Sequence, residues 1–561
     1  MQISSVLTSL SSLAILVSGA IANSDVQHLT KRCENSATDR SCWGDYDLST
    51  NYYDEVPDTG VTVEVYLELV NTTASLDGLE RNVLLVNGTF PGPTIMANWG
   101  DTVVVHVLNS LENNGTGIHF HGIRQNYTNS MDGVPSITQC AIAPGDSMTY
   151  TWRATQYGSS WYHSHFALQA WEGVLGGIII NGPASANYDH DAGNVFLNDW
   201  THQTADAMYN AAQTTGPPAL DNGIINGTNT FPGDTSLGAR FEMSVTEGDS
   251  YRLRLVNGAI DTHFKFSVDN HTMTVMAMDF VPIIPYTADV ISIGMGQRYD
   301  VVINMNQTAD NYWIRAIPQT FCSDNDNADD IKGILRYDAT STADPTSAAY
   351  SYVDDCDGEA MSDLVPSVAL NAGTVTTNDE EAVTVGRSGG VFKWFMAATT
   401  FAVEWADPTL LQIYNGDSNW TTSSHVIQVD NANEWVYFII ETAQAVPHPI
   451  HLHGHDFFIL AQAEGTYSSD VTLQTTNPPR RDVAMLPASG YLVIGFETDN
   501  PGAWLMHCHI GWHTSEGFAL QIVERMDEIP ALMDYDSFNA TCANWNTYAE
   551  AFGIEEEDSG V

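Results

Sequence analysis

The stretch Val61-Thr62-Val63-Glu64-Val65-Tyr66-Leu67-Glu68-Leu69 alternates apolar and polar residues almost without interruption. A period of two is typical of a β-strand with one buried face. Long amphipathic helical patterns are scarce in the rest of the chain, whereas turn signals such as Asn-Gly and Pro-Gly recur throughout. The sequence therefore predicts an all-β protein.

Several strand-like segments of the chain repeat. Residues 100–109 resemble residues 248–257, and a fainter third copy lies at residues 433–442. Repetition at this spacing predicts three related Greek-key β-sandwiches, each of roughly 175 residues. We place these three units at residues 33–184, 185–364 and 365–561.

The first residues have the character of an export signal. Residues 6–22 are apolar or small and end in Ala20-Ile21-Ala22, a pattern that signal peptidase cleaves. A dibasic Lys31-Arg32 follows, as expected of a trimmed pro-segment. We therefore expect a signal peptide at residues 1–22, a pro-segment at residues 23–32 and a secreted, extracellular protein.

Two further features fit export. No later stretch has the length and hydropathy of a transmembrane helix. Nine Asn-x-Ser/Thr sites are consistent with a glycoprotein: Asn71, Asn87, Asn114, Asn126, Asn226, Asn270, Asn306, Asn419 and Asn539.

The charge balance limits the partners. Acidic residues outnumber basic residues by 69 to 19, and the formal net charge is −50. Such a field repels nucleic-acid backbones and anionic membrane surfaces. We therefore expect no nucleic acid and no membrane as partners, and a monomer is the default for so acidic a chain.

Histidines gather in His-x-His pairs. Alternate residues of a strand point to one face, so each pair can offer two imidazoles, which suit copper, zinc, iron and nickel. The chain has five such pairs: His119/His121, His163/His165, His451/His453, His453/His455 and His507/His509. Two pairs lie in the first unit and the others in the last, so we expect the site where these units meet.

The number of imidazoles indicates a polynuclear metal cluster. Eight histidines exceed what one metal can hold: His119, His121, His163, His165, His451, His453, His507 and His509. Zinc rarely needs so many, and a two-metal hydrolase would normally add bridging carboxylates, which these motifs lack.

Seven cysteines leave one thiol over if six form disulfides. Cys508 lies between His507 and His509, with His513 shortly after and His448 upstream. One thiolate with two imidazoles is the ligand set of a blue-copper electron-transfer site. The chain itself would then join an electron-accepting copper to the cluster.

The usual position of the weak axial ligand holds Phe518. A phenyl ring cannot coordinate, so this copper would be effectively three-coordinate. Loss of the axial donor favours Cu(I) and raises the reduction potential.

Four ordered motifs resemble the copper signatures of multicopper oxidases, and most closely those of ascomycete laccases. They are His119-Phe120-His121-Gly122, His163-Ser164-His165, His448-Pro449-Ile450-His451-Leu452-His453-Gly454-His455 and His507-Cys508-His509-Ile510-Gly511-Trp512-His513. The resemblance covers nearly all of the mature chain. It implies three consecutive cupredoxin-like domains and four copper ions, one of type 1, one of type 2 and two of type 3.

Residue by residue, the resemblance implies the following ligands. His448, Cys508 and His513 would hold the type 1 copper, and His119 and His451 the type 2 copper. The type 3 pair would take His121, His163, His165, His453, His507 and His509.

The resemblance also implies the disulfides Cys33–Cys42, Cys140–Cys542 and Cys322–Cys356, although six cysteines alone allow fifteen pairings. The tail Asp558-Ser559-Gly560-Val561 resembles a C-terminal plug of the solvent channel to the cluster. It departs from the family in ending with Val rather than Leu. Phe518 is a second departure, because ascomycete forms usually have Leu there and high-potential basidiomycete forms have Phe.

The activity implied is that of a laccase, used in lignin or phenolic breakdown, detoxification or pigment synthesis. A phenol or aryl amine would give up one electron at a time through the edge of His513. The electrons would pass through Cys508 and reduce dioxygen to water. Asp261 takes the position of the substrate-pocket acid that accepts the phenol proton, and Asp132 that of the acid that supplies protons near the type 2 copper.

Three other functions are compatible with the same sequence motifs. A ferroxidase would share every copper ligand, but such enzymes usually need a membrane anchor beside a permease. Ascorbate oxidase is a further relative with the same copper chemistry. A non-catalytic copper-binding or storage protein is the alternative from another class, although a through-chain link at Cys508 is useful only if electrons flow.

Overall fold

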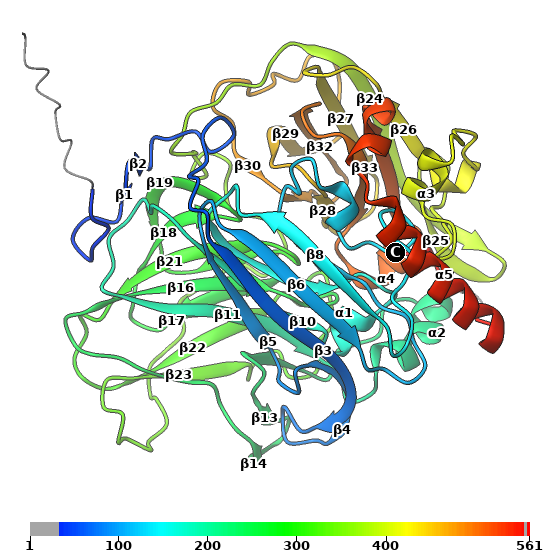
Figure 1. Ribbon diagram of the computed structural model, residues 1–561. Coiled ribbons are helices and arrows are strands. Elements are labelled where there is room, and N and C mark those ends of the chain that lie inside the picture. The colour runs from blue at the N-terminus through cyan, green and yellow to red at the C-terminus, as the bar shows by residue number, and fades with distance from the viewer. Residues whose placement is uncertain (1–32, 555–557) are drawn as a thin grey trace, which may run out of the picture.

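The structure, a computed structural model, describes residues 33–554 and 558–561 (Figure 1). The expected signal peptide (1–22) and pro-segment (23–32) lie outside the described residues. Apart from two small hairpins, the described strands belong to six sheets that follow each other in three pairs along the chain.

The first pair of sheets contains the alternating stretch. One sheet has the strand order β4 (Arg81–Val86), β3 (Thr62–Ala74), β6 (Thr102–Asn109), β8 (Ser147–Arg153). The other has the order β5 (Gly92–Asn98), β10 (Leu175–Asn181), β9 (Gly158–Ser164), β7 (Ile118–Phe120). In β6, Val103, Val105 and Val107 are fully buried while the residues between them are less so, as expected of a strand with one face on a core.

The second pair follows along the chain. Its larger sheet has the order β12 (Asn222–Ile225), β11 (His190–Trp200), β16 (Ser250–Asn257), β21 (Arg298–Asn304), β18 (Met273–Met278), β19 (Val281–Ala288). Its smaller sheet has the order β15 (Glu242–Ser244), β23 (Lys332–Arg336), β22 (Asn311–Pro318), β17 (Phe264–Val268), β20 (Ile291–Ile293).

The third pair completes the series. One sheet has the order β25 (Val391–Met396), β24 (Val375–Ser388), β27 (Trp435–Thr442), β32 (Gly490–Glu497), β29 (Phe457–Glu464), β30 (Arg480–Arg481). The other has the order β26 (Val426–Val429), β34 (Ala519–Glu524), β33 (Gly502–Cys508), β28 (His448–Leu452), β31 (Val483–Leu486).

The three sequence copies occupy equivalent strands. β6 lies between a parallel neighbour, β3, and an antiparallel neighbour, β8. β16 lies in the same way between β11 and β21, and β27 between β24 and β32. Three related β-sandwich units are therefore confirmed: the first contains β3–β10, the second β11–β23 and the third β24–β34. The exact boundaries near residues 185 and 365 fall between these strands and stay predictions.

The remaining elements are short. Two small hairpins pair β1 (Cys42–Trp43) with β2 (Tyr46–Asp47) and β13 (Thr230–Phe231) with β14 (Asp234–Gly238). The helices are α1 (Gln169–Glu172), α2 (Ala205–Thr215), α3 (Thr409–Tyr414), α4 (Gly511–Ser515) and α5 (Tyr535–Phe552), with 3₁₀ turns η1 (Asn129–Met131), η2 (Thr422–Ser424) and η3 (Met526–Leu532). None of the described helices combines the length and apolar character needed to cross a bilayer.

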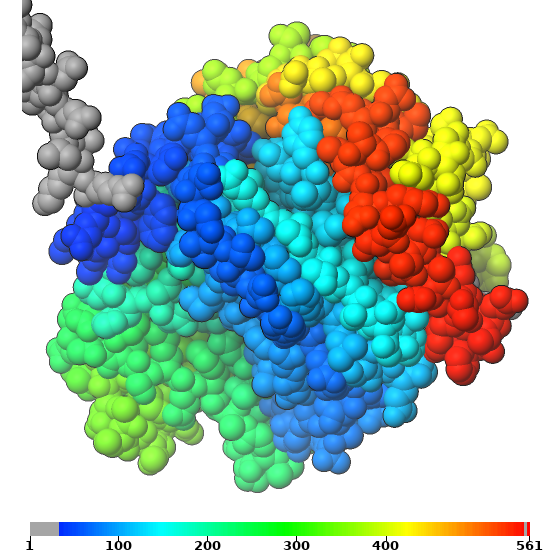
Figure 2. All heavy atoms as spheres, in the orientation of Figure 1, coloured from blue at the N-terminus to red at the C-terminus, as the bar shows by residue number. Residues whose placement is uncertain are grey.

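The end of the chain ties the first unit to the third. In Figure 2 the red C-terminal segment lies between the cyan first unit and the yellow part of the third unit. The Cys140–Cys542 disulfide joins α5 to the first unit. The last residues are buried: the Val403 amide donates to the Ser559 carbonyl at 3.0 Å, and the Trp405 indole donates to the Gly560 carbonyl at 3.1 Å.

The other two disulfides are local. Cys33–Cys42 spans nine residues and Cys322–Cys356 spans 34, and with Cys140–Cys542 these are the pairings that the resemblance implied. Among the described cysteines only Cys508 is free, and it is buried.

We expect the double variant Cys140→Ala/Cys542→Ala to unfold at a clearly lower temperature than the wild type. The disulfide spans 402 residues, and cross-links that close long loops restrict the unfolded chain most, so the loss should be about 5 kcal/mol. Scanning calorimetry measures the unfolding temperature and the loss of stability. The matched control, Cys33→Ala/Cys42→Ala, opens a loop of nine and should lose only about 2 kcal/mol. Equal losses would contradict the stabilising role assigned to the long link.

Candidate metal centre

Two equivalent strand pairs supply the histidines. In the first unit β7 pairs with β9 so that His119 lies opposite His163. In the third unit β28 pairs with β33 so that His451 lies opposite His507. The second histidine of each motif follows two residues later, directly after the end of its strand. The structure thus brings the eight histidines together at the meeting of the first and third units, as the sequence predicted.

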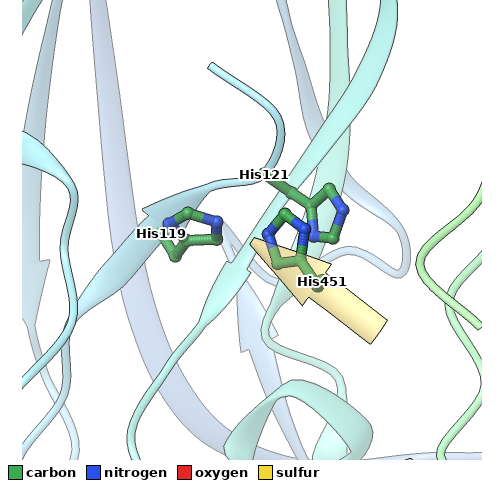
Figure 3. A group of neighbouring side chains, drawn as sticks. All are labelled: His119, His121 and His451. Atoms are coloured by element: carbon green, nitrogen blue, oxygen red, sulfur yellow. The ribbon is translucent and has the colours of Figure 1, made fainter. Parts of the chain in front are cut away.

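The histidines form compact groups. The donor atoms within each group lie within 4.8 Å of one another, and all the side chains are buried. The groups are His119/His121/His451, His121/His163/His509 and His165/His453/His507. Figure 3 shows the first of them, in which the rings of His121 and His451 stack with centroids 3.9 Å apart.

Hydrogen bonds leave a free nitrogen on key rings. His119 Nδ1 donates to the Asp132 carbonyl at 2.8 Å, and His451 Nδ1 donates to the Asp482 carbonyl at 2.7 Å. The Nε2 atoms of both rings are buried without a hydrogen-bond partner. An imidazole fixed by a carbonyl through one nitrogen, with the other unpaired, is the usual state of a metal-binding histidine.

Burial favours the neutral form of seven histidine rings of the cluster. Desolvation lowers the pKa of His121, His163, His165, His451, His453 and His509 well below the ordinary value, and that of His507 to about 4. Neighbouring imidazoles push in the same direction, because two positive rings repel. Neutral imidazole is the form that binds metal ions.

A separate group contains Cys508, His448 and His513. Their donor atoms lie within 4.8 Å of one another, with Cys508 Sγ 3.7 Å from His513 Nδ1. Both ring nitrogens of His448 are buried without a partner, and burial lowers its pKa to about 3. Burial raises the pKa of the Cys508 thiol, so a metal that binds the sulfur must displace a proton.

Phe518 lies beside this group and offers no donor atom. Its ring centroid is 5.4 Å from that of His448, and it stacks on Trp394 at 5.1 Å. Trp394 also contacts His513, at 4.3 Å between ring centroids. The apolar rings shield the thiol side of the site from water.

A cavity of about 300 Å³ opens next to the Cys508 group and is lined by His513, Asp261 and Trp394 among others. Burial, and then the nearby Asp199, raise the pKa of Asp261 to about 7. The Asp199 carboxylate holds the loop of Asp261 by accepting the amides of Ile260, Asp261 and Thr262 at 2.9–3.0 Å. Asp261 and His513, which are far apart in the sequence, thus line one cavity.

Asp132 lies inside the histidine cluster. Its carboxylate accepts a hydrogen bond from His453 Nδ1 at 2.8 Å and is 3.2 Å from His119 Nδ1. One carboxylate therefore contacts histidines of the first and third units. This position beside His119 is the one that a proton-supplying acid would need.

Sequence reasoning missed Asp482. This fully buried carboxylate forms a two-point ion pair with Arg298 of the second unit at 2.5 and 2.6 Å, and accepts from His121 Nε2 at 3.2 Å. Asp482 therefore touches all three units. The sequence feature that could have indicated Asp482 is Arg480-Arg481-Asp482, because two adjacent arginines are unusual in a chain with only 19 basic residues.

Comparisons with known proteins agree with this geometry. Three models described as multicopper oxidase match residues 68–185, 191–340 and 397–528. Laccase-2 of Botryotinia fuckeliana is 48% identical over 551 residues, covering 95% of this chain and 94% of that protein. The laccase of Neurospora crassa is 40% identical, covering 94% of this chain and 89% of that protein. The crystal structure of the laccase from Botrytis aclada has a TM-score of 0.92 at 48% identity, and the match covers 94% of this chain and all of that one.

The chain therefore belongs to the multicopper oxidase family, and its three sandwiches are cupredoxin-like domains. Within that family it is an oxidoreductase of the fungal laccase type.

The family implies four copper ions, one of type 1, one of type 2 and two of type 3. The described residues fit these ions. Buried ring nitrogens without partners lie on His119, His165, His448, His451 and His509, and the buried free thiol lies with two imidazoles. Nitrogen and thiolate donors of this kind suit copper.

We expect Asp482→Asn to destabilise the protein by about 3 kcal/mol, because it removes the closer of the two carboxylates that pair with the buried Arg298 and leaves only Asp279, at 3.5 Å. Denaturant unfolding of the purified variant measures the loss. Asp249→Asn is the matched control, since Asp249 forms an exposed pair with His190 and should lose less than about 1 kcal/mol. If both variants unfold alike, the Arg298 pair does not hold the units together.

Proposed function

We propose that this protein is a secreted, monomeric laccase. It takes electrons one at a time from phenols and aryl amines and uses four of them to reduce dioxygen to water. One observation carries the proposal: a buried Cys–His₂ group beside an open cavity is joined to an eight-histidine cluster by the consecutive residues His507, Cys508 and His509. Breakdown of lignin and other phenolics, detoxification and pigment synthesis all use this chemistry.

The proposed ligand sets follow the observed groups. His448, Cys508 and His513 would hold the type 1 copper, and His119 and His451 the type 2 copper. The groups His121/His163/His509 and His165/His453/His507 would hold the two type 3 ions. When bound, copper supplies one-electron acceptance at the Cys508 group and the capacity to reduce dioxygen at the cluster.

Side chains around the two metal sites have the remaining proposed roles in binding the donor and moving protons. His513 lines the cavity, so a donor ring lying there contacts its imidazole edge. Asp261 accepts the proton that a phenol loses when it gives up an electron. Asp132, which accepts a hydrogen bond from His453, would pass protons toward the cluster where water forms. Phe518 offers no donor atom to a copper held by His448, Cys508 and His513, which would favour its reduced state and a high potential.

Related enzymes with other donors remain the second candidate. A ferroxidase or an ascorbate oxidase would use the same ligands. The structure of Fet3p, described as a multicopper oxidase that functions in iron import, has a TM-score of 0.77 at 27% identity. The laccases match at 40–48% identity, which favours phenolic donors.

The visible spectrum of the copper-loaded protein tests the proposal. We expect a strong blue thiolate-to-copper band that disappears when a phenol is added without air and returns with air. Cys508→Ser should lack the band while the cluster keeps its copper. A fully loaded protein without the band would remove the Cys508 assignment. A band that phenol cannot bleach but Fe(II) or ascorbate can would move the function to the second candidate, and copper uptake without dioxygen consumption would indicate a storage protein.

Asp261→Asn should slow phenol oxidation while leaving non-phenolic electron donors unaffected, because an amide cannot accept the phenol proton. The pKa of Asp261 is raised to about 7, so the carboxyl is protonated below that pH and able to accept a proton above it. The wild-type rate with phenols should therefore rise as the pH passes through about 7, and the variant should lack this rise. Steady-state rates across pH with both donor types measure it. Equal loss with both donors would remove the proton-acceptor role.

A further inference from the structure

Three metal-binding side chains meet in the third unit outside the groups described above. Asp379 and Glu381 alternate on β24, so they point to the same face of that strand. His425 directly precedes β26, a strand of the other sheet of the same sandwich. Its Nε2 lies 3.5 Å from Glu381 Oε1.

His425 and Glu381 are farther apart than the hydrogen-bonded histidine–carboxylate pairs, although His202 and Asp221 lie 3.7 Å apart. Hydrogen-bonded pairs among the described residues have N–O distances of 2.8–3.2 Å, as in His202–Asp77, His455–Glu524 and His121–Asp482. A separation of 3.5 Å is too long for a strong hydrogen bond. It does match two ligands of one ion, since atoms bound at about 2.1 Å to a tetrahedral centre lie roughly 3.4 Å apart.

The same side chains carry buried atoms that have no partner. The Glu381 side chain is only 4% exposed, yet its Oε2 accepts no hydrogen bond, and the buried Nδ1 of His425 also has none. Leaving such atoms unpaired away from water is unfavourable. An ion that binds the carboxylate through both of its oxygens would give Glu381 Oε2 a partner.

No described lysine or arginine balances the carboxylates. Burial, and then the charge of Glu381 and a hydrogen bond with it, raise the pKa of Asp379 to about 6, so the two carboxyl groups lie side by side. Among the described residues neither Asp379 nor Glu381 has an ion pair with a lysine or arginine, and His425 is the one basic side chain paired with Glu381. The cluster therefore has ligands and negative charge but lacks a counterion.

We propose that Asp379, Glu381 and His425 form a binding site for a divalent cation of the zinc class, separate from the four copper sites. Two carboxylates and one imidazole are ligands that zinc accepts at about 2.0–2.2 Å, with water as a fourth. Asp379 is half-buried and His425 is 12% exposed, so the ion can enter from solvent. Because the ligands come from both sheets of the third sandwich, the ion links them.

Zinc counting in the copper-complete protein tests the site, because filled copper sites cannot take up the probe. The protein is dialysed against Zn²⁺ near neutral pH and then against zinc-free buffer, and both metals are measured in the same sample. We expect the wild type to retain a zinc ion in addition to its copper. Glu381→Gln and His425→Asn should lose the zinc but keep the copper; Asn suits the left-handed backbone at position 425.

Two further variants keep the test decisive. His190→Asn removes an exposed histidine that also lies beside a carboxylate, and it should retain the zinc. If Glu381→Gln does not fold, Asp379→Asn, at a half-buried position, tests the same site. Zinc should also raise the unfolding temperature of the wild type but not that of His425→Asn.

Three results would contradict the proposed site: the wild type retains no zinc after dialysis, both His425→Asn and Asp379→Asn keep it, or His190→Asn loses it as fully as the site variants do. None of these outcomes bears on laccase activity, so the site and the proposed function stand or fall separately.

Discussion

The histidine cluster depends on two strand pairs from opposite ends of the chain facing each other across one interface. β7 and β9 present their histidines from the first unit, and β28 and β33 present theirs from the third, in the same register. Neither unit holds a complete group, because each of the three histidine groups contains residues from both. The disulfide from Cys140 to Cys542 and the buried tail fix this interface from outside, and the second unit fixes it from within through Arg298.

Several arginines of this acidic protein are buried, where they pair with buried carboxylates. Arg298, Arg480 and Arg481 are almost completely buried, and Arg481 pairs with the buried Asp279 at 3.0 Å. A buried carboxylate is tolerable when a guanidinium or several N–H groups satisfy it. Buried arginines contribute no positive charge to the surface, so the surface is more uniformly negative than the composition alone suggests. This is consistent with small neutral or cationic electron donors rather than anionic macromolecules.

The sequence predicted the fold class and the histidine cluster because both rest on short periodic patterns. Strand alternation, His-x-His spacing and the three copies of one strand are local features that chain geometry turns directly into faces and registers. It did not predict Asp482, whose importance arises from contacts between units. It did not predict Trp394 either, because its contacts with His513 and Phe518 join segments of the third unit that are far apart in the sequence. The proposed site at Asp379, Glu381 and His425 could be predicted only in part. The spacing of Asp379 and Glu381 on one strand is visible in the sequence, but only the fold brings His425 to them.

Strand geometry also explains how one short segment serves two sites. Successive residues of β33 point to opposite sides, so His507 faces the cluster while Cys508 faces away from it. The chain then turns into α4, which returns His513 to the side of Cys508, at 3.7 Å from its sulfur. The amide of Gly511 donates to the Ile260 carbonyl at 2.9 Å and so anchors this turn to the loop of Asp261. Donor cavity, thiol and cluster are thus held in fixed relation by the alternation of a single strand, and any insertion within it would separate the site that takes electrons from the site that uses them.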